Sequence, residues 1–120
     1  MEPYQKNFDE FMSKYSRSET TPSEVGEVLT RIAGLYPNYN LAMVKAERAY
    51  SLISKSEVEK TDENTGKAVT STKAETLAEA SNEAFLYKQA RAHVQNIELL
   101  IGSLKFLQKG LEVEFMNASI

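Results

Sequence analysis

The fold is decided by residues 87–115, YKQARAHVQNIELLIGSLKFLQKGLEVEF, which carry the most regular hydrophobic pattern in the chain. One set of positions recurs there at alternating steps of three and four: Tyr87, Ala90, Val94, Ile97, Ile101, Leu104, Gln108, Leu111 and Phe115. This spacing places the whole set on one side of an α-helix, as a helical bundle or coiled coil requires. We therefore predict a long helix from about Lys73 to Phe115.

Two shorter helices are predicted upstream. The first runs from about Pro3 to Tyr15, because aromatic and apolar residues there form one helical stripe. The second begins at Thr21-Pro22-Ser23-Glu24, which combines an N-cap, a proline at the first helical position and a capping-box glutamate. We expect it to end at Tyr36, because the residue before a proline avoids the α conformation.

A third helix is predicted from Leu41 to about Lys60, capped by Asn40, and the polar run 61–72 is expected to form the tip of a hairpin. The sequence thus predicts an all-α fold within a single domain, residues 1–120. It consists of two short helices in 1–37 and a long antiparallel helical hairpin in 38–116.

The proposed hairpin leaves part of the hydrophobic seam without a partner. Folding back near residues 66 and 67 places residue 46 beside residue 87, and the third helix starts opposite residue 93. The helix beyond residue 93 then overhangs by about 30 Å. Either the first two helices or a second copy of the chain must cover it, and both alternatives predict a homo-oligomer. The candidate self-association seam is Val94, Ile97, Ile101, Leu104, Leu111 and Phe115.

Composition favours a cytoplasmic protein. The 120 residues include no cysteine, 14 basic and 17 acidic residues, and the start of the chain lacks the pattern of a secretory signal. No apolar run approaches the ~20 residues needed to cross a bilayer. We therefore expect no disulfide and no membrane segment, and the charge balance argues against nucleic-acid binding by bulk charge.

Residues with catalytic or metal-binding chemistry are sparse. His93 is the one histidine and has no glutamate at helical spacing, while Glu75, Glu79 and Glu83 share one predicted helix face that we interpret as solvated. Glycines occur singly, so no nucleotide-binding loop is present, and Gly102 and Gly110 within a helix suggest close packing. The sequence therefore predicts neither an enzyme nor a metal site, and no cofactor.

Basic residues suggest one candidate binding surface. In the proposed hairpin, Lys45, Arg48, Lys88 and Arg91 should meet, and Lys105 and Lys109 extend this basic character. Such a strip suits phosphates of a nucleotide or single strand, with Tyr50 and Tyr87 as stacking faces. The alternative is that these side chains are solvated flanks of the seam.

A series of short segments recurs along about residues 40–115: Thr65-Gly66-Lys67, Lys73-Ala74-Glu75, Glu83, Tyr87-Lys88, Ile97-Glu98, Ser103-Leu104-Lys105 and Leu111-Glu112. In these residues the chain resembles small helical-hairpin proteins of phage and prophage early regions, often encoded beside recombination and single-strand-binding genes. The resemblance implies a phage accessory protein without catalysis of its own, and it transfers no functional residue.

Two functions follow as hypotheses. In the first, the protein is a non-enzymatic, self-associating scaffold of phage type that binds a protein or nucleic-acid partner through the hairpin. In the second, it is an oligomeric anti-defence module that sequesters nucleotides or short single strands at the basic strip. Replacing Lys88 and Arg91 by glutamate distinguishes them, because only the second requires those cations.

Overall fold

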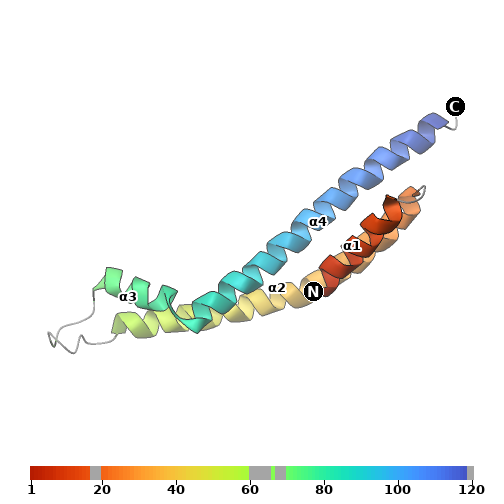
Figure 1. Ribbon diagram of the computed structural model, residues 1–120. Coiled ribbons are helices and arrows are strands. Elements are labelled where there is room, and N and C mark those ends of the chain that lie inside the picture. Colours follow the sequence, from red (N-terminus) through yellow and green to blue (C-terminus); the bar gives the residue numbers. More distant parts are fainter. Residues whose placement is uncertain (17–19, 60–65, 67–69, 119–120) are drawn as a thin grey trace. The chain divides into compact units, whose positions relative to one another are not determined.

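A computed structural model of the chain describes residues 1–16, 20–59, 66 and 70–118. Over these residues the regular secondary structure consists of four α-helices: α1 (Pro3–Tyr15), α2 (Pro22–Glu59), α3 (Ser71–Glu79) and α4 (Asn82–Ala118) (Figure 1). The predicted all-α fold is confirmed. The predicted hairpin tip, 61–72, lies mostly outside the described residues; within it, Gly66 has a positive φ of 68° and α3 already begins at Ser71.

The first two helices begin where the sequence predicts. The bounds of α1 are those predicted, and Pro22 opens α2. The backbone N–H of Glu24 donates to the hydroxyl oxygen of Thr21 over 3.3 Å, and that hydroxyl donates to the Glu24 carboxylate over 3.4 Å. These bonds confirm the predicted capping of the helix start.

The predicted boundary at Pro37 is wrong. Pro37 lies inside α2, which continues to Glu59, so Asn40 is an internal helical residue and no cap. The neighbours of Pro37 explain why the local preference is overridden. Tyr36 is hydrogen-bonded to Glu98 of α4, and the ring of Tyr39 contacts the ring of His93, also on α4. Tertiary packing on each side of the proline thus stabilises the helical backbone against a local cost of about 3 kcal/mol.

The single helix predicted from Lys73 to Phe115 is also wrong, because the chain breaks at Ala80 and Ser81. The hydroxyl oxygen of Ser81 accepts a hydrogen bond from the backbone N–H of Ala84 over 3.1 Å, as an N-cap does at the start of a new helix. Ser81 therefore lies between the end of α3 and the start of α4 and acts as the N-cap of α4. The acidic series Glu75, Glu79 and Glu83 is consequently divided between two helices.

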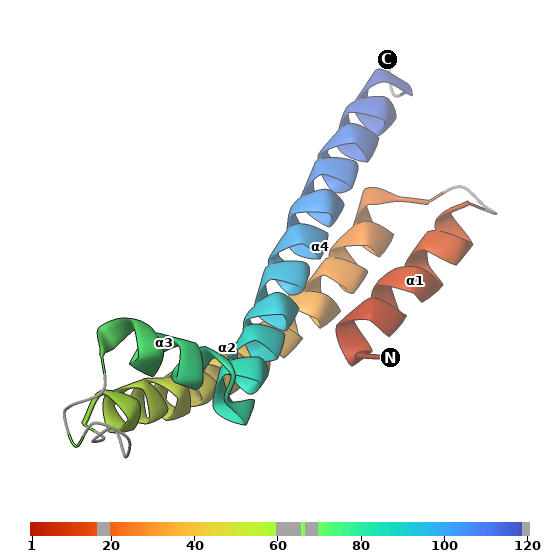
Figure 2. The same cartoon turned by 60° about the vertical axis from the view of Figure 1, so that its left-hand side comes forward.

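The residues group into two compact units, which we describe separately. Unit 1 comprises Met1–Pro37 and Gln95–Ile120, and unit 2 comprises Asn38–Val94. In unit 1, α2 and α4 run antiparallel: Tyr36 meets Glu98, and Pro22 meets Gln108. Helix α1 lies beside the first part of α2 (Figure 2), where Lys14 and Glu24 form an ion pair of 3.3 Å.

In unit 2, α2 and α4 are again antiparallel. Tyr39 meets His93, with ring centroids 5.6 Å apart, which is close to the predicted register. Tyr50, rather than residue 46, lies opposite Tyr87, one turn from the prediction, since a tip symmetric about residues 66 and 67 leaves out the turn at Ser81. Helix α3 lies beside the last part of α2 (Figures 1 and 2).

The two cores differ in the size of their side chains. Buried hydrophobic residues of unit 1 are Tyr4, Phe11, Val25, Val28, Ile32, Ile97, Leu104 and Leu111, whereas those of unit 2 are Ala74, Ala78, Ala84 and Val94. Small alanines let helices approach closely but remove little apolar area from water. Large hydrophobic residues of unit 2 remain exposed, among them Phe85 at 62%.

The structure covers most of the predicted self-association seam within one chain. Val94, Ile97, Leu104 and Leu111 are buried, Ile101 is half-buried, and Phe115 is 47% exposed. Four of these six side chains are therefore already packed without a second copy. Within the described helices, none combines the length and apolar character needed to cross a membrane.

Candidate functional site

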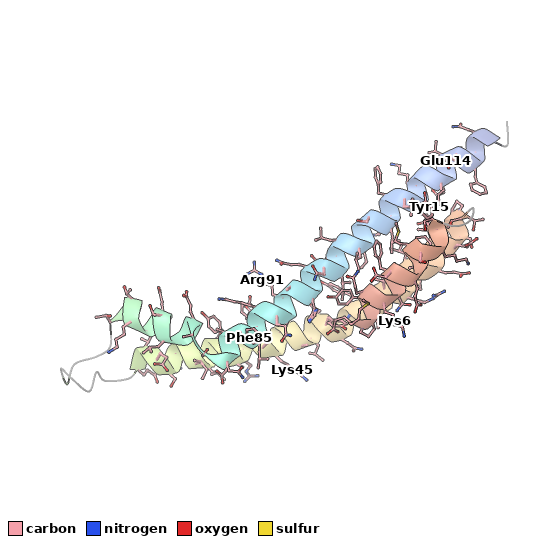
Figure 3. The ribbon with its side chains drawn as sticks, viewed as in Figure 1. Lys6, Tyr15, Lys45, Phe85, Arg91 and Glu114 are labelled. Atoms are coloured by element: carbon pink, nitrogen blue, oxygen red, sulfur yellow. The ribbon has the colours of Figure 1, made fainter. Side chains whose placement is uncertain are left out.

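The structure does not gather the predicted basic strip into one site. Lys45 and Arg48 lie on α2, Lys88 and Arg91 lie on α4, and all four are exposed. In Figure 3, Lys45 and Arg91 project to opposite sides of the helix pair. None of the four forms an ion pair with a carboxylate in the part of the chain that the structure describes.

Two further predicted cations, Lys105 and Lys109, belong to unit 1 and are also exposed. They lie on the C-terminal part of α4, whereas the other four belong to unit 2. The six predicted cations are thus divided between the units, with four in unit 2 and two in unit 1.

The two tyrosines proposed as stacking faces stack on each other. The rings of Tyr50 and Tyr87 have centroids 5.9 Å apart and planes inclined by 18°, and both residues are half-buried. One face of each ring is thus covered by its partner. This pair joins α2 to α4 in unit 2, which is a structural role.

No metal site emerges from the described residues, in which no three histidine, cysteine or acidic side chains converge. His93 packs against Tyr39, with ring planes inclined by 56°. This contact between α4 and α2 gives His93 a role in packing the two helices together.

Unit 1 has a groove of about 750 Å³ between α2 and α4, which we call the α2–α4 groove. Its lining is mainly apolar. The residues that line it are Leu29, Thr30, Ala33, Gly34 and Tyr36 of α2, and Glu98, Ile101 and Lys105 of α4. A Cβ atom added at Gly34 would meet no neighbouring atom within 4 Å, so the space beside this part of the wall is open.

The groove lies on the face of α2 that α1 leaves uncovered. Helix α1 packs against Glu24, Val28 and Arg31 of α2, together with Glu27. With about 3.6 residues per turn, Ala33 lies roughly half a turn around the helix from those positions. One side of the α2–α4 pair in unit 1 thus holds a third helix, and the other side is open.

One end of the groove carries a polar pair. The hydroxyl of Tyr36 donates a hydrogen bond to Oε1 of Glu98 over 3.2 Å. Partial desolvation, this hydrogen bond and the negative charge of Glu98 together raise the pKa of the Tyr36 phenol above its ordinary value of 10.0. The phenol therefore stays protonated near neutral pH and acts as a donor, while Glu98 supplies a negative charge at the groove rim.

A backbone acceptor accompanies that pair. Pro37 has no N–H, so it cannot donate to the carbonyl of Ala33 four residues earlier in α2. Ala33 itself lines the groove. The carbonyl of Ala33 therefore lacks its helical donor, and Glu98 supplies a carboxylate at the same groove; both groups can accept hydrogen bonds.

The sequence did not predict the groove. The expectation that the second helix ends at Tyr36 separated Tyr36 from any partner on the last helix. A helix continued through Pro37 would have indicated both the antiparallel pairing of Tyr36 with Glu98 and the unpaired carbonyl of Ala33.

Comparison of the chain with protein-family models, with curated proteins and with solved structures finds no match. The assignment of function therefore depends on the geometry of the chain itself.

Proposed function

We propose that the protein is a non-enzymatic, self-associating interaction protein that binds an amphipathic helix of a protein partner in the α2–α4 groove. The observation that carries this proposal is the vacant side of the α2–α4 pair in unit 1. Helix α1 fills the opposite side, and a further helix in the groove would complete a four-helix arrangement. An accessory role of the phage type, implied by the resemblance, is compatible with action by binding alone.

The chemistry of the groove defines the partner. Leu29, Ala33 and Ile101 favour an apolar helix face. Glu98 carries a negative charge and the carbonyl of Ala33 lacks its helical donor, so a lysine or arginine beside that apolar face supplies both a donor and a positive charge. The partner is therefore an amphipathic helix with a basic residue at one edge of its apolar stripe.

A pair of synthetic helices tests the proposal. One peptide carries a leucine stripe flanked by lysines, and the other carries the same stripe flanked by glutamates. Calorimetry with the full chain should show that the lysine peptide binds at least ten-fold more tightly. Glu98→Gln should reduce that preference, because it removes the charge while keeping a side chain of the same shape.

Two matched substitutions locate the binding. Ala33→Arg places bulk and positive charge in the groove and should weaken binding of the lysine peptide at least ten-fold. Ala42→Arg makes the same change at an exposed alanine of α2 in unit 2 and should leave binding unchanged. Equal affinity of both peptides, or unchanged binding by Ala33→Arg, would contradict the proposal.

A further inference from the structure

Helix α4 is apolar on two opposite faces in unit 1. Ile97, Leu104 and Leu111 are buried against the rest of the unit. On the other side, Leu99, Phe106 and Val113 follow one another at steps of seven and are 69%, 83% and 50% exposed. A contiguous apolar helix face is normally covered by a partner, and this second face has none among the described residues of the chain.

We call this second face the outer stripe: Leu99, Phe106, Val113 and Met116, of which Met116 is 69% exposed. With Leu99 as the a position of a heptad, Phe106 and Val113 are also a positions. Gly102, Lys109 and Met116 then fall at d. We propose that a second copy of this chain covers the outer stripe, with the two α4 helices antiparallel. This inference rests on the self-association in the proposed function. No residue of the outer stripe lines the groove, and Lys105 borders both surfaces.

The charges beside the outer stripe are complementary to those of a second copy of the chain, which favours that copy as the binding partner. Lys105 and Glu112 occupy successive g positions, where they flank the stripe. Both are exposed, and neither is ion-paired with another described residue. In an antiparallel pair the g positions of the two helices face each other. Lys105 of each copy then meets Glu112 of the other, which gives two equivalent ion pairs.

A parallel arrangement lacks this complementarity. It would set Lys109 against Lys109 of the second copy in one core layer, a like-charge contact. Its g positions would face Ser103, Gly110 and Asn117, none of which carries a charge. The antiparallel register instead pairs Leu99 with Met116 and lays the stem of Lys109 along the ring of Phe106, leaving the ammonium at the edge.

The glycines of α4 fit the same contact. Gly102 and Gly110 are exposed, and a Cβ atom at either would meet nothing within 4 Å in one chain. The close packing predicted for them is therefore not made within the chain, although each costs about 1 kcal/mol of helix stability relative to alanine. Opposite a second α4, Gly102 faces Val113 and Gly110 faces Ser103, so the two backbones can approach closely.

Light scattering after size-exclusion chromatography tests the inference on the full chain. The wild type should give twice the monomer mass of 13.5 kDa. Phe106→Glu should raise the dimer Kd at least about 100-fold, since a central aromatic anchor is replaced twice. Phe85→Glu, at an exposed phenylalanine of unit 2, should keep the dimer mass. Circular dichroism checks that each variant is folded.

A charge exchange tests orientation. Lys105→Glu and Glu112→Lys should each weaken the dimer, and the double variant should restore it to within about three-fold of wild type. The chain has no cysteine, so introduced cysteines report the register. Leu99→Cys chains mixed with Met116→Cys chains should form a disulfide between them, whereas Leu99→Cys chains alone should not.

Three results would overturn the inference: a monomeric wild type, an unchanged dimer in Phe106→Glu, or a disulfide between two Leu99→Cys chains. Its failure is separable from failure of groove binding. The lysine peptide should bind Phe106→Glu as it binds the wild type, because Phe106 does not line the groove. Loss of peptide binding in Ala33→Arg, conversely, should leave the dimer mass unchanged.

Discussion

The side-chain amide of Gln108 donates a hydrogen bond to the carbonyl oxygen of Pro22, 3.1 Å away, and joins two residues 86 positions apart. The same amide nitrogen would lie 2.9 Å from a Cβ atom at position 26, so Gly26 leaves the space that this bond occupies. Gln108, a polar residue in the hydrophobic seam of α4, thus links α4 to the start of α2 in unit 1 by a hydrogen bond.

This relationship predicts that residues 26 and 108 are energetically coupled. Gly26→Ala should gain less than the roughly 1 kcal/mol expected for alanine in a helix, because the new methyl displaces Gln108. Gln108→Ala alone should cost about 1 kcal/mol for the lost hydrogen bond. In the Gln108→Ala background, Gly26→Ala should show the full helical gain. Chemical denaturation of the four variants measures the coupling, and strict additivity would refute it.

Tyr36 should titrate above its ordinary pKa of 10.0, because partial desolvation and Glu98 favour the protonated phenol. A pKa that is raised in the folded state stabilises the protein fully below the unfolded value. That contribution is lost as the pH rises through the folded value. The difference in phenolate absorbance between wild type and Tyr36→Phe isolates this group. Glu98→Gln should lower its pKa, and an unchanged titration would remove Glu98 as a cause.

Thr20 should tolerate replacement by valine. It is 5% exposed, and its hydroxyl oxygen has no hydrogen-bond partner among the described residues. Thr20→Val keeps the shape and removes an unsatisfied polar group, so we expect stabilisation of up to about 1 kcal/mol in thermal or urea unfolding. Thr21→Val is the matched control. It removes the cap of α2 and should cost about 1 kcal/mol. Equal losses at both positions would indicate that Thr20 has a partner after all.

Replacing Pro37 should separate stability from binding. Pro37→Ala restores a donor to the carbonyl of Ala33 and should stabilise the protein by about 1–3 kcal/mol. The same change should weaken binding of the lysine peptide, because that carbonyl is then already satisfied. Pro22→Ala, at the first position of α2, should alter neither quantity by more than about 0.5 kcal/mol. Tighter peptide binding by Pro37→Ala would argue against the carbonyl as part of the site.

Local signals were sufficient for some elements. The aromatic stripe of α1 and the capping residues at Thr21 and Glu24 act within one or two helical turns, so the sequence alone predicts those elements. The antiparallel register was predictable to about one turn, since chain length about a tip limits which residues can meet. The pairing of Tyr39 with His93 follows from this limit.

Other features depend on competition between local and tertiary terms. At Pro37 the local penalty is outweighed by contacts that its neighbours Tyr36 and Tyr39 make with α4, which no local rule contains. At Ser81 the local signal for a helix start was present in the sequence. The residues around it favour a helix, so the sequence predicted one continuous helix and the break was missed. The groove was missed because it depends on the continuity of α2 through Pro37.

The tyrosine stack of unit 2 has an optical consequence. The chain has six tyrosines and no tryptophan, so phenol rings dominate its near-ultraviolet circular dichroism. Two stacked rings with centroids 5.9 Å apart and nearly parallel planes couple their electronic transitions, whereas a freely rotating tyrosine contributes little. Tyr50→Phe or Tyr87→Phe should therefore remove more signal than one ring carries. The near-ultraviolet circular dichroism of this tyrosine pair therefore reports whether α2 and α4 are packed together in unit 2. Thermal separation of these two helices can be followed by that signal without a label.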